Sequence, residues 1–307
     1  MTRPAPTAPA QTGPALTVAV VSDRGMFLPS LRAVDGVLRR AGPGVDVLFA
    51  GLGLTDAMWG MVDRVAAAHP AARIDARPLP PDWLAEARSP KSFITPTALG
   101  RLFLPRLVPS GRVLYLDGDV MVTGDLALAL DLDMAGQPLA GVRDFSVMKW
   151  TVAGAPHPGL QRQIDAMPDG MPMTDYINSG VLLMDMDAIH AIPGLTDAMA
   201  DMVAARGFPT VDQDRINILF RDRIVHLDPA WNCSWGRLAQ QRRHQAGLPV
   251  TGVQPAPMIL HFHGPRKPWQ PLRLSTLSRG ARAIWRYRKE MAAFHRRYPS
   301  IPQALPE

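Results

Sequence analysis

The chain has 307 residues, of which 47% are hydrophobic, enough for a large core in one α/β domain or one domain with an extension. It carries 33 Lys and Arg against 27 Asp and Glu, and this net charge of +6 suits an acidic ligand or surface without identifying either. The single cysteine, Cys233, excludes an internal disulfide and a cysteine-based zinc site, and it favours a reducing, cytoplasmic location. No run approaches the roughly 20 apolar residues that a membrane-spanning helix needs.

Residues 1–15 are rich in proline, alanine and threonine. They lack the continuous apolar stretch of a signal peptide, and we expect a disordered tail. From residue 16 onward, short apolar runs alternate with stretches whose apolar residues recur at helical spacing. The predicted strands are residues 16–21, 45–50, 73–76, 112–116, 139–142 and 180–184, and the predicted helices are residues 28–38, 58–68, 97–107 and 189–206.

This alternation predicts an α/β domain over residues 16–270, with a mostly parallel central sheet covered by helices on both faces. Ligands of such sheets bind beyond the carboxyl ends of the strands. Three polar clusters follow apolar strands in this way, namely Ser22–Asp23, Asp117–Gly118–Asp119 and His261–Phe262–His263. We therefore expect these clusters to meet at one edge of the sheet.

Residues 271–307 differ in character, with eight Lys or Arg and only two acidic residues. Four apolar residues fall on one face of a predicted helix, while most of its cations lie elsewhere: Ile284, Tyr287, Met291 and Phe294. Two interpretations of this basic C-terminal extension stay open. The apolar stripe packs on the domain as in an ordinary helix, or the helix lies on an anionic membrane.

Asp117 and Asp119 are the first candidates for chemistry. Residues two apart in an extended chain point to the same side, about 7 Å apart, so two carboxylates can hold one hard cation. The chain contains four such aspartate pairs, and the other three begin at Asp131, Asp185 and Asp212. Only Asp117 directly follows a continuous apolar strand, and this position favours a metal site.

The segment of residues 258–269 brings together ligands for a metal and for a diphosphate. A short apolar run delivers His261 and His263 to the same side, and imidazole is a good ligand for a transition-metal ion. Gly264 allows backbone N–H groups to approach a phosphate, and Lys267 supplies a positive charge. Both histidines remain candidates from spacing alone.

Four motifs occur in the order in which glycosyltransferase family eight has them: VLYLDGDVMV at 113–122, INSGVLLMDM at 177–186, VDQDRIN at 211–217 and LHFHGPRKPW at 260–269. The chain resembles this family, which includes glycogenin and bacterial lipopolysaccharide galactosyl- and glucosyltransferases, from about residue 17 to residue 270. The resemblance implies a GT-A fold, that of the nucleotide-diphospho-sugar transferases. It also implies a UDP-sugar donor, Mn²⁺ or Mg²⁺ as the metal, and retention of the anomeric configuration.

The resemblance also implies roles for particular residues. Asp117, Asp119 and His261 match the metal ligands, which leaves His263 a neighbour rather than a ligand. Gly264 and Lys267 match the diphosphate contacts, Asp23 the residue that reads the uracil, and Arg101 an arginine that contacts the donor. The residues that match the surroundings of the transferred sugar are Asp144, Asn178, Asp212 and Gln213. After Asp23 the chain departs from the family with Arg24, Gly25 and Met26, a departure that concerns the base and ribose contacts but not the metal.

The predicted reaction transfers glucose or galactose from the UDP-sugar to a hydroxyl of a cell-envelope glycan such as lipopolysaccharide, free or lipid-linked, with no role for nucleic acid. Asp144, Asp212 or the Gln213 carbonyl is expected to stabilise positive charge at the anomeric carbon. Gln213 is a poor nucleophile, which favours attack on the same face from which UDP leaves.

Two rivals remain. An Asp-x-Asp phosphohydrolase of the haloacid dehalogenase type also uses an aspartate at a strand end, but it leaves the loop at 261–269 unexplained. A non-catalytic UDP-sugar-binding protein predicts binding without turnover, and it leaves the survival of Asp144, Asp212 and Gln213 unexplained. Asp212 as a helix N-cap and Asn178 as a loop cap are the structural alternatives for those two residues.

Overall fold

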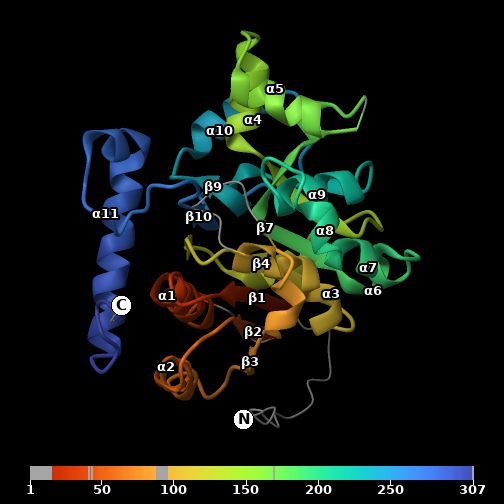
Figure 1. Ribbon diagram of the computed structural model, residues 1–307. Coiled ribbons are helices and arrows are strands. Elements are labelled where there is room, and N and C mark those ends of the chain that lie inside the picture. The colour runs from red at the N-terminus through yellow and green to blue at the C-terminus, as the bar shows by residue number, and fades with distance from the viewer. Residues whose placement is uncertain (1–15, 41, 43, 88–95, 169, 306–307) are drawn as a thin grey trace.

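The computed structural model describes residues 16–40, 42, 44–87, 96–168 and 170–305. The predicted disordered tail at residues 1–15 lies outside these ranges. A central sheet runs through the molecule, and a long C-terminal helix lies along one side of it (Figure 1).

The central sheet has seven strands in the order β3-β2-β1-β4-β7-β6-β8. Their bounds are Leu16–Ser22 for β1, Val45–Gly51 for β2, Ile74–Pro78 for β3, Arg112–Leu116 for β4, Leu139–Arg143 for β6, Ile177–Asp185 for β7 and Ile224–His226 for β8. Strands β3, β2, β1 and β4 are parallel, whereas β7 is antiparallel to both of its neighbours, β4 and β6. The sheet is therefore mostly parallel, as predicted.

The reversal of β7 matters for the site. Because β4 and β7 are antiparallel, the carboxyl end of β4 lies beside the beginning of β7, and Leu116 pairs with Val181. The amide N–H of Asp117 donates to the carbonyl oxygen of Gly180 at 2.8 Å. Residues that begin β7 thus reach the same edge of the sheet as residues that follow β4.

A second, three-stranded sheet delivers the histidine. Its order is β5-β10-β9, with bounds Val120–Val122, Ile259–His261 and Cys233–Ser234 in that order. Strand β10 is antiparallel to β5, and His261 pairs with Val120. The turn at residues 117–119 joins β4 of the large sheet to β5 of the small one, which brings His261 next to Asp119.

Two apolar cores cover the faces of the large sheet. One contains side chains of α1 (Phe27–Leu38) and α2 (Asp56–Ala67), and the other contains side chains from residues 99–108 and from the helices between 186 and 219. Residues 99–108 include α3 (Leu104–Leu107), and the helices between 186 and 219 are α6 (Met186–His190), α7 (Leu195–Ala200), α8 (Met202–Ala205) and α9 (Asp212–Leu219). The short 3-10 helices are Pro81–Leu84, Pro96–Phe103, Leu126–Asp131, Met173–Asp175 and Pro229–Asn232.

Two predicted helices differ from the structure. Residues 97–107 form a 3-10 helix followed by the single turn of α3, and residues 189–206 are divided among α6, α7 and α8. Pro193 and Gly194 interrupt the latter stretch, because proline cannot donate a helical hydrogen bond and Gly194 has a left-handed φ of 74°. A second break follows at Asp201, whose side chain accepts from the N–H of Ala204 and caps α8.

Helices α4 (Phe145–Ala153) and α5 (Pro158–Ala166) form a hairpin that projects from one end of the molecule beside α10 (Leu238–His244), as Figure 1 shows. Helix α4 is capped by Asp144, which accepts from the N–H groups of Ser146 and Val147. It ends at Gly154, whose φ of 66° suits a residue without a side chain.

Helix α11 (Leu274–Arg297) forms most of the basic C-terminal extension. Its predicted apolar stripe faces the domain: Ile284, Tyr287 and Phe294 are buried, and Met291 packs beside them. Packing on the domain, one of the two interpretations of this stripe, therefore holds. Within the described residues, no helix is both long enough and apolar enough to cross a membrane.

Candidate active site

A cavity of about 550 Å³ lies beyond the carboxyl ends of β1 and β4 and the beginning of β7. Its size falls within the range of about 300–1,000 Å³ that is usual for ligand pockets. Every residue predicted from the sequence to bind or act on a ligand lines it: Asp23, Arg101, Asp117, Asp119, Asp144, Asn178, Asp212, Gln213, His261, Gly264 and Lys267. The sheet topology therefore gathers residues that are up to 244 positions apart in the sequence into one cavity, from Asp23 to Lys267.

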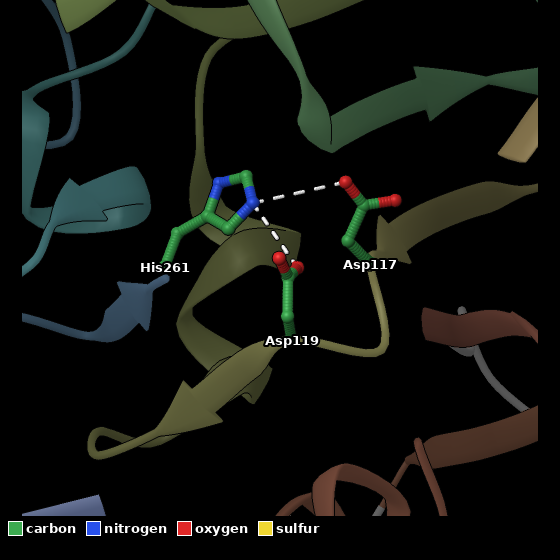
Figure 2. A group of neighbouring side chains, drawn as sticks. All are labelled: Asp117, Asp119 and His261. Carbon is green, nitrogen blue, oxygen red and sulfur yellow. Dashed lines mark ion pairs between the residues drawn. The ribbon is translucent and has the colours of Figure 1, made fainter. Parts of the chain in front are cut away.

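Asp117, Asp119 and His261, called the metal cluster below, point toward one another (Figure 2). The Nε2 atom of His261 lies 3.2 Å from a carboxylate oxygen of Asp119 and 3.7 Å from one of Asp117. One potential ligand atom from each residue falls within 4.8 Å of the others, and no other such group of three occurs among the described residues. Two carboxylates and an imidazole form a donor set that suits Mn²⁺ or a similar divalent ion.

Two glycines make room for the metal cluster. A Cβ atom on Gly180 would lie 2.6 Å from the Oδ2 atom of Asp117 and would also collide with the ring of His261. A Cβ atom on Gly118 would collide with the hydroxyl of Ser30. Both positions therefore require glycine because of close approach, and Gly180 borders the space between the proposed ligands.

Asn232 orients the imidazole of His261. The Nδ1 atom of His261 lies 2.9 Å from the Oδ1 atom of Asn232, whose own Nδ2 donates to the Oδ1 atom of Asn178. Asn178 in turn donates from Nδ2 to the carboxylate of Asp144 at 3.0 Å, and a carboxylate can only accept. This chain of bonds directs the Asn232 oxygen to His261, so Nδ1 of the ring carries a proton and Nε2 is the atom turned toward Asp117 and Asp119, where a metal ion would bind it.

Asp119 is ionised. Burial alone would raise the pKa of its carboxyl, but the Lys267 ammonium and His261 outweigh burial and hold the pKa well below its usual range. The Lys267 ammonium pairs directly with Asp119. Asp119 is therefore charged and able to bind a cation, and Lys267 beside it is able to bind a diphosphate.

Arg101 forms ion pairs with two carboxylates of the cavity. Its buried guanidinium pairs with Asp117 at 2.8 Å and with Asp212 at 3.2 Å, and it donates to the carbonyl oxygen of Ser179 at 2.5 Å. Burial would lower the pKa of Arg101, but these two carboxylates raise it above its ordinary value. Tyr115 donates to Asp117 as well, at 2.7 Å. Arg101 and Tyr115 therefore fix the position of one proposed metal ligand.

Asp144, Asn178 and Gln213 form a second group, called the amide cluster below. Gln213 accepts from the side-chain amide of Asn178 at 3.0 Å and from the backbone N–H of Ser179 at 3.2 Å. Its own amide nitrogen lies 3.4 Å from the carboxylate of Asp144. The cluster thus presents hydrogen-bonding groups and one carboxylate in the same cavity as the metal cluster.

Comparison with known proteins identifies the family. The profile of glycosyl transferase family 8 matches residues 78–272, more than half of the chain. The chain belongs to glycosyl transferase family 8. The predicted relationship is confirmed, and the phosphohydrolase interpretation is set aside.

Individual relatives are distant from this family 8 chain. Glycosyltransferase GlyF of Streptococcus pneumoniae is 28% identical over 191 residues, which make up 60% of this chain and 39% of GlyF. The lipopolysaccharide 1,2-glucosyltransferase of Escherichia coli is 25% identical over 162 residues, 52% of this chain and 44% of that enzyme. The chain thus spans less than half the length of these two relatives.

Solved structures confirm the GT-A fold. The galactosyltransferase LgtC, determined in complex with donor and acceptor sugar analogues, superposes with a TM-score of 0.68 at 20% identity, covering 95% of this chain and 98% of LgtC. The apo form of GlyE from Streptococcus pneumoniae superposes with a TM-score of 0.58 at 20% identity, covering 93% of this chain and 64% of GlyE. The likeness extends across the N-terminal strands that the family profile does not include.

The two histidines of the family 8 loop have different surroundings. His263 lies outside the metal cluster, and its Nε2 atom shares a hydrogen bond of 2.7 Å with the hydroxyl of Ser234. Burial and the neighbouring His261 lower the pKa of His263 to about 3, so this ring is neutral. His261 is the histidine that faces both aspartates.

The structural roles considered for Asp212 and Asn178 were a helix N-cap and a loop cap, and the structure shows only the second. Asp212 is not an N-cap, because Val211 precedes α9 and the Asp212 carboxylate instead accepts from the Ser179 hydroxyl at 3.0 Å. Burial raises the pKa of Asp212, with Arg101 opposing this rise. Asn178 does cap its loop by accepting from the N–H of Gly180, and it joins the amide cluster as well.

Val211 is strained at the entrance to α9, with a φ of 50° that a β-branched residue rarely adopts. Such strain persists only where the surroundings enforce it, and it is concentrated at functional sites. Here it places Asp212 and Gln213 directly after the turn, both facing the cavity.

Sequence reasoning missed a buried network behind the amide cluster. Tyr176 donates to Asp214 at 2.5 Å and lies 3.2 Å from the amide nitrogen of Gln213. Gln163 donates to the same Asp214 oxygen at 2.6 Å. Burial and Asp214 raise the pKa of Tyr176 well above its usual range, so its hydroxyl remains a donor. The only signal was Asp214 as the second member of an Asp-x-Asp pair.

The departure from the family after Asp23 falls at the cavity itself. Gly25 and Met26 line it together with Asp23, whose Oδ1 atom accepts from the N–H of Met26 at 2.9 Å. Arg24 turns away and donates to the carbonyl oxygen of Gly53. The loop thus keeps Asp23 at the cavity although the residues after it differ.

Proposed function

We propose that this chain is a retaining, metal-dependent glycosyltransferase that moves glucose or galactose from a UDP-sugar to a hydroxyl of a cell-envelope glycan. The observation that carries the proposal is the metal cluster of Asp117, Asp119 and His261, which faces the amide cluster across one cavity. Family 8 membership supports glycosyl transfer, and the related lipopolysaccharide 1,2-glucosyltransferase supports a hexose donor and an envelope acceptor.

Asp117, Asp119 and His261 would hold the cation, with Mn²⁺ favoured by the mixed oxygen and nitrogen donors. When bound, the ion supplies positive charge that stabilises a departing diphosphate. Lys267, next to Asp119, and the backbone at Gly264 add fixed positive charge and N–H donors on the same side. Asp23 and Arg101 line the part of the cavity assigned to the rest of the nucleotide.

The amide cluster is assigned to the sugar. The bond between the anomeric carbon and the diphosphate oxygen breaks, a bond to the acceptor oxygen forms on the same face, and the acceptor proton passes to the departing diphosphate. Asp144, Asp212 and the Gln213 carbonyl stabilise positive charge at the anomeric carbon, while Asn178 holds sugar hydroxyls. Gln213 is held by Asn178 and Ser179, and this restraint lowers the cost of orienting it during reaction.

We propose contact with an anionic membrane through an exposed part of α11, which suits a lipid-linked acceptor. The stripe first considered for this contact is buried, but Leu274 and Trp285, on either side of a kink at Gly280, are 86% and 66% exposed. The exposed cations Arg282, Arg286 and Lys289 lie on the same segment as Trp285. Aromatic and cationic side chains together favour an anionic interface. The cytoplasmic location stays a prediction.

UDP release tests the proposed activity. Purified protein is incubated with a panel of UDP-sugars, with Mn²⁺ or with a chelator, and we expect slow hydrolysis of one UDP-hexose even without an acceptor. Asp119→Ala abolishes this hydrolysis, whereas Asp131→Ala, in an exposed Asp-x-Asp pair outside the cavity, retains it. UDP binding without release from any donor would support the non-catalytic alternative, and release that survives the chelator would overturn the metal's role.

A further inference from the structure

The cavity extends beyond the amide cluster to the α4–α5 hairpin. Helix α4 contributes Ser146 and Trp150 to its lining, α5 contributes Gly159 and Arg162, and the loop before α9 contributes Thr210. In Figure 1, β7 and α9, which carry Asn178 and Gln213, lie between β1 and the α4–α5 hairpin, so this end of the cavity is the one left for an acceptor. The inference below therefore rests on the proposed function.

Trp150 is held in place at this end. Its ring stacks on the ring of His157, with centroids 4.1 Å apart and planes 17° apart. A Cβ atom on Gly159 would lie 2.7 Å from the Trp150 ring, so the indole packs directly on the backbone at the start of α5. A fixed aromatic side chain that lines a cavity offers a surface on which a sugar ring can lie at little entropic cost.

Arg162 gives this end of the cavity its charge. Within the part of the chain that the structure describes, it is the only charged residue that lines the cavity from α4, α5 or residues 209–210. The acidic lining residues all come from outside α4, α5 and residues 209–210: Asp23, Asp117, Asp119, Asp144 and Asp212. In the described ranges, the structure gives the exposed Arg162 side chain no ion pair and no hydrogen bond to a carboxylate.

Positive side chains also gather beside α4, outside the cavity lining. His244 of α10 packs edge-on against Phe145, with ring centroids 5.9 Å apart. The Arg237 guanidinium lies over the same Phe145 ring, 3.9 Å from its centroid, and burial together with the nearby Lys149, Arg243 and Arg237 lowers the pKa of His244. Among the described residues, no acidic side chain from α4, α5 or residues 209–210 lines the cavity beside Arg162.

We propose that the α4–α5 end of the cavity takes an acceptor sugar that carries a carboxylate or a phosphate, and that Arg162 recognises this anionic group while Trp150 packs on the ring. A guanidinium matches carboxylate and phosphate oxygens with two parallel hydrogen bonds, which a neutral hydroxyl cannot provide. The acceptor is thus an anionic glycan, and Arg162 is its specificity-determining residue.

The test compares anionic with neutral acceptors. UDP release from the preferred UDP-hexose is measured with methyl β-D-glucoside, methyl β-D-glucuronide and methyl β-D-glucoside 6-phosphate. We expect at least one anionic glycoside to be used with a kcat/KM about tenfold or more above that of the neutral one, as a charge-assisted hydrogen bond warrants. Which anionic glycoside is preferred distinguishes carboxylate from phosphate.

Variants then assign the preference to Arg162. We expect Arg162→Gln to reduce the ratio of anionic to neutral efficiency to near one, and Arg162→Lys to retain part of it. The matched control is Arg223→Gln, which removes the same charge at an exposed position outside the cavity and should keep the full ratio. Comparing the ratio within each variant cancels any change in donor handling.

Saturation-transfer NMR with UDP and Mg²⁺ measures binding of the same glycosides without turnover, so it separates this inference from the proposed activity. The protein could release no UDP from any donor and still bind anionic glycosides preferentially through Arg162. That result would contradict the proposed activity but support recognition of an anionic glycan at this end of the cavity. Equal binding of neutral and anionic glycosides would overturn the proposed recognition of an anionic acceptor. A preference that survives in Arg162→Gln would overturn it as well.

Discussion

Gly180 determines how closely the proposed metal ligands can approach. A Cβ atom there would come within 2.6 Å of the Oδ2 atom of Asp117 and would meet the ring of His261. Gly180→Ala should therefore abolish Mn²⁺ binding, measured by electron paramagnetic resonance of the free ion, while circular dichroism shows an intact fold. The control Gly60→Ala, in α2 with open space around it, should keep full binding and gain about 0.5–1 kcal/mol of stability. Tight Mn²⁺ binding by Gly180→Ala would place the ion elsewhere.

Asn232 makes a second prediction at this scale. Asn232→Leu removes the oxygen that accepts from Nδ1 of His261, and the Nε2 lone pair is no longer directed at the aspartates. We expect Mn²⁺ affinity to fall by about 10- to 100-fold, the usual effect of losing such a supporting bond. Asn232→Asp keeps an acceptor and should bind Mn²⁺ at least tenfold more tightly than the leucine variant. Equal affinities of the two variants would refute this orienting role.

Particular residues also show what the sequence could and could not reveal. Asp117 and Asp119 were predicted because they follow a continuous apolar strand. Strand-end position offered both His261 and His263, and only the resemblance to family eight selected His261. The contacts of Tyr176 with Gln213 and Asp214 were not predicted, because the sequence does not reveal which side chains meet behind the cavity wall. The tautomer of His261 likewise depends on Asn232, a residue 29 positions away.

At the scale of elements, the strands were predicted more accurately than the helices. Buried parallel strands are short continuous apolar runs, a signal that residues 112–116 carry clearly. The direction of β7 was not predictable from its own composition, because an apolar run looks the same in either orientation. The stretch at 189–206 keeps apolar spacing through Gly194 and Asp201, where local backbone geometry ends one helix and starts another.

Helix α11 carries a prediction of its own about membranes. The protein should bind vesicles that contain phosphatidylglycerol and not vesicles of phosphatidylcholine alone, and added salt should weaken this binding. Replacing both Leu274 and Trp285 with serine should reduce flotation with anionic vesicles by about tenfold or more, since both side chains are largely exposed. Val253→Ser serves as the control, because Val253 is as exposed as Trp285, at 66%, but lies far from α11 in sequence. Unchanged flotation of the double variant would exclude this surface.

At the scale of the whole molecule, α11 is tied to the N-terminal half by a buried carboxylate. Asp35 of α1 pairs with Arg297 and Arg39 and accepts from the hydroxyl of Tyr298 at 3.0 Å. Burial raises the pKa of Asp35, but the two arginines outweigh it and leave the pKa below its ordinary value of 3.8. A depressed folded-state pKa means that this stabilisation is present above about pH 4 and is lost as the pH falls further.

Asp35→Asn tests this link. At pH 7 the variant should lose about 1.5–3 kcal/mol in the free energy of unfolding measured with urea, because Arg297 and Arg39 lose their hydrogen bonds to a charged partner. The difference from the wild-type protein should shrink below pH 4, where the native aspartate becomes protonated as well. A difference that stays constant down to pH 3 would show that the carboxylate charge is not what holds α11 in place.

The central claim is that one divalent ion sits among Asp117, Asp119 and His261, and its most direct test is a crystal grown with UDP and Mn²⁺ and measured at the manganese absorption edge. We expect a single strong anomalous peak, from an ion bonded to both carboxylates and to Nε2 of His261. We also expect Lys267 to have moved from Asp119 toward the diphosphate. A peak that has no bond to His261, or UDP bound in the cavity with no peak at these three residues, would contradict it.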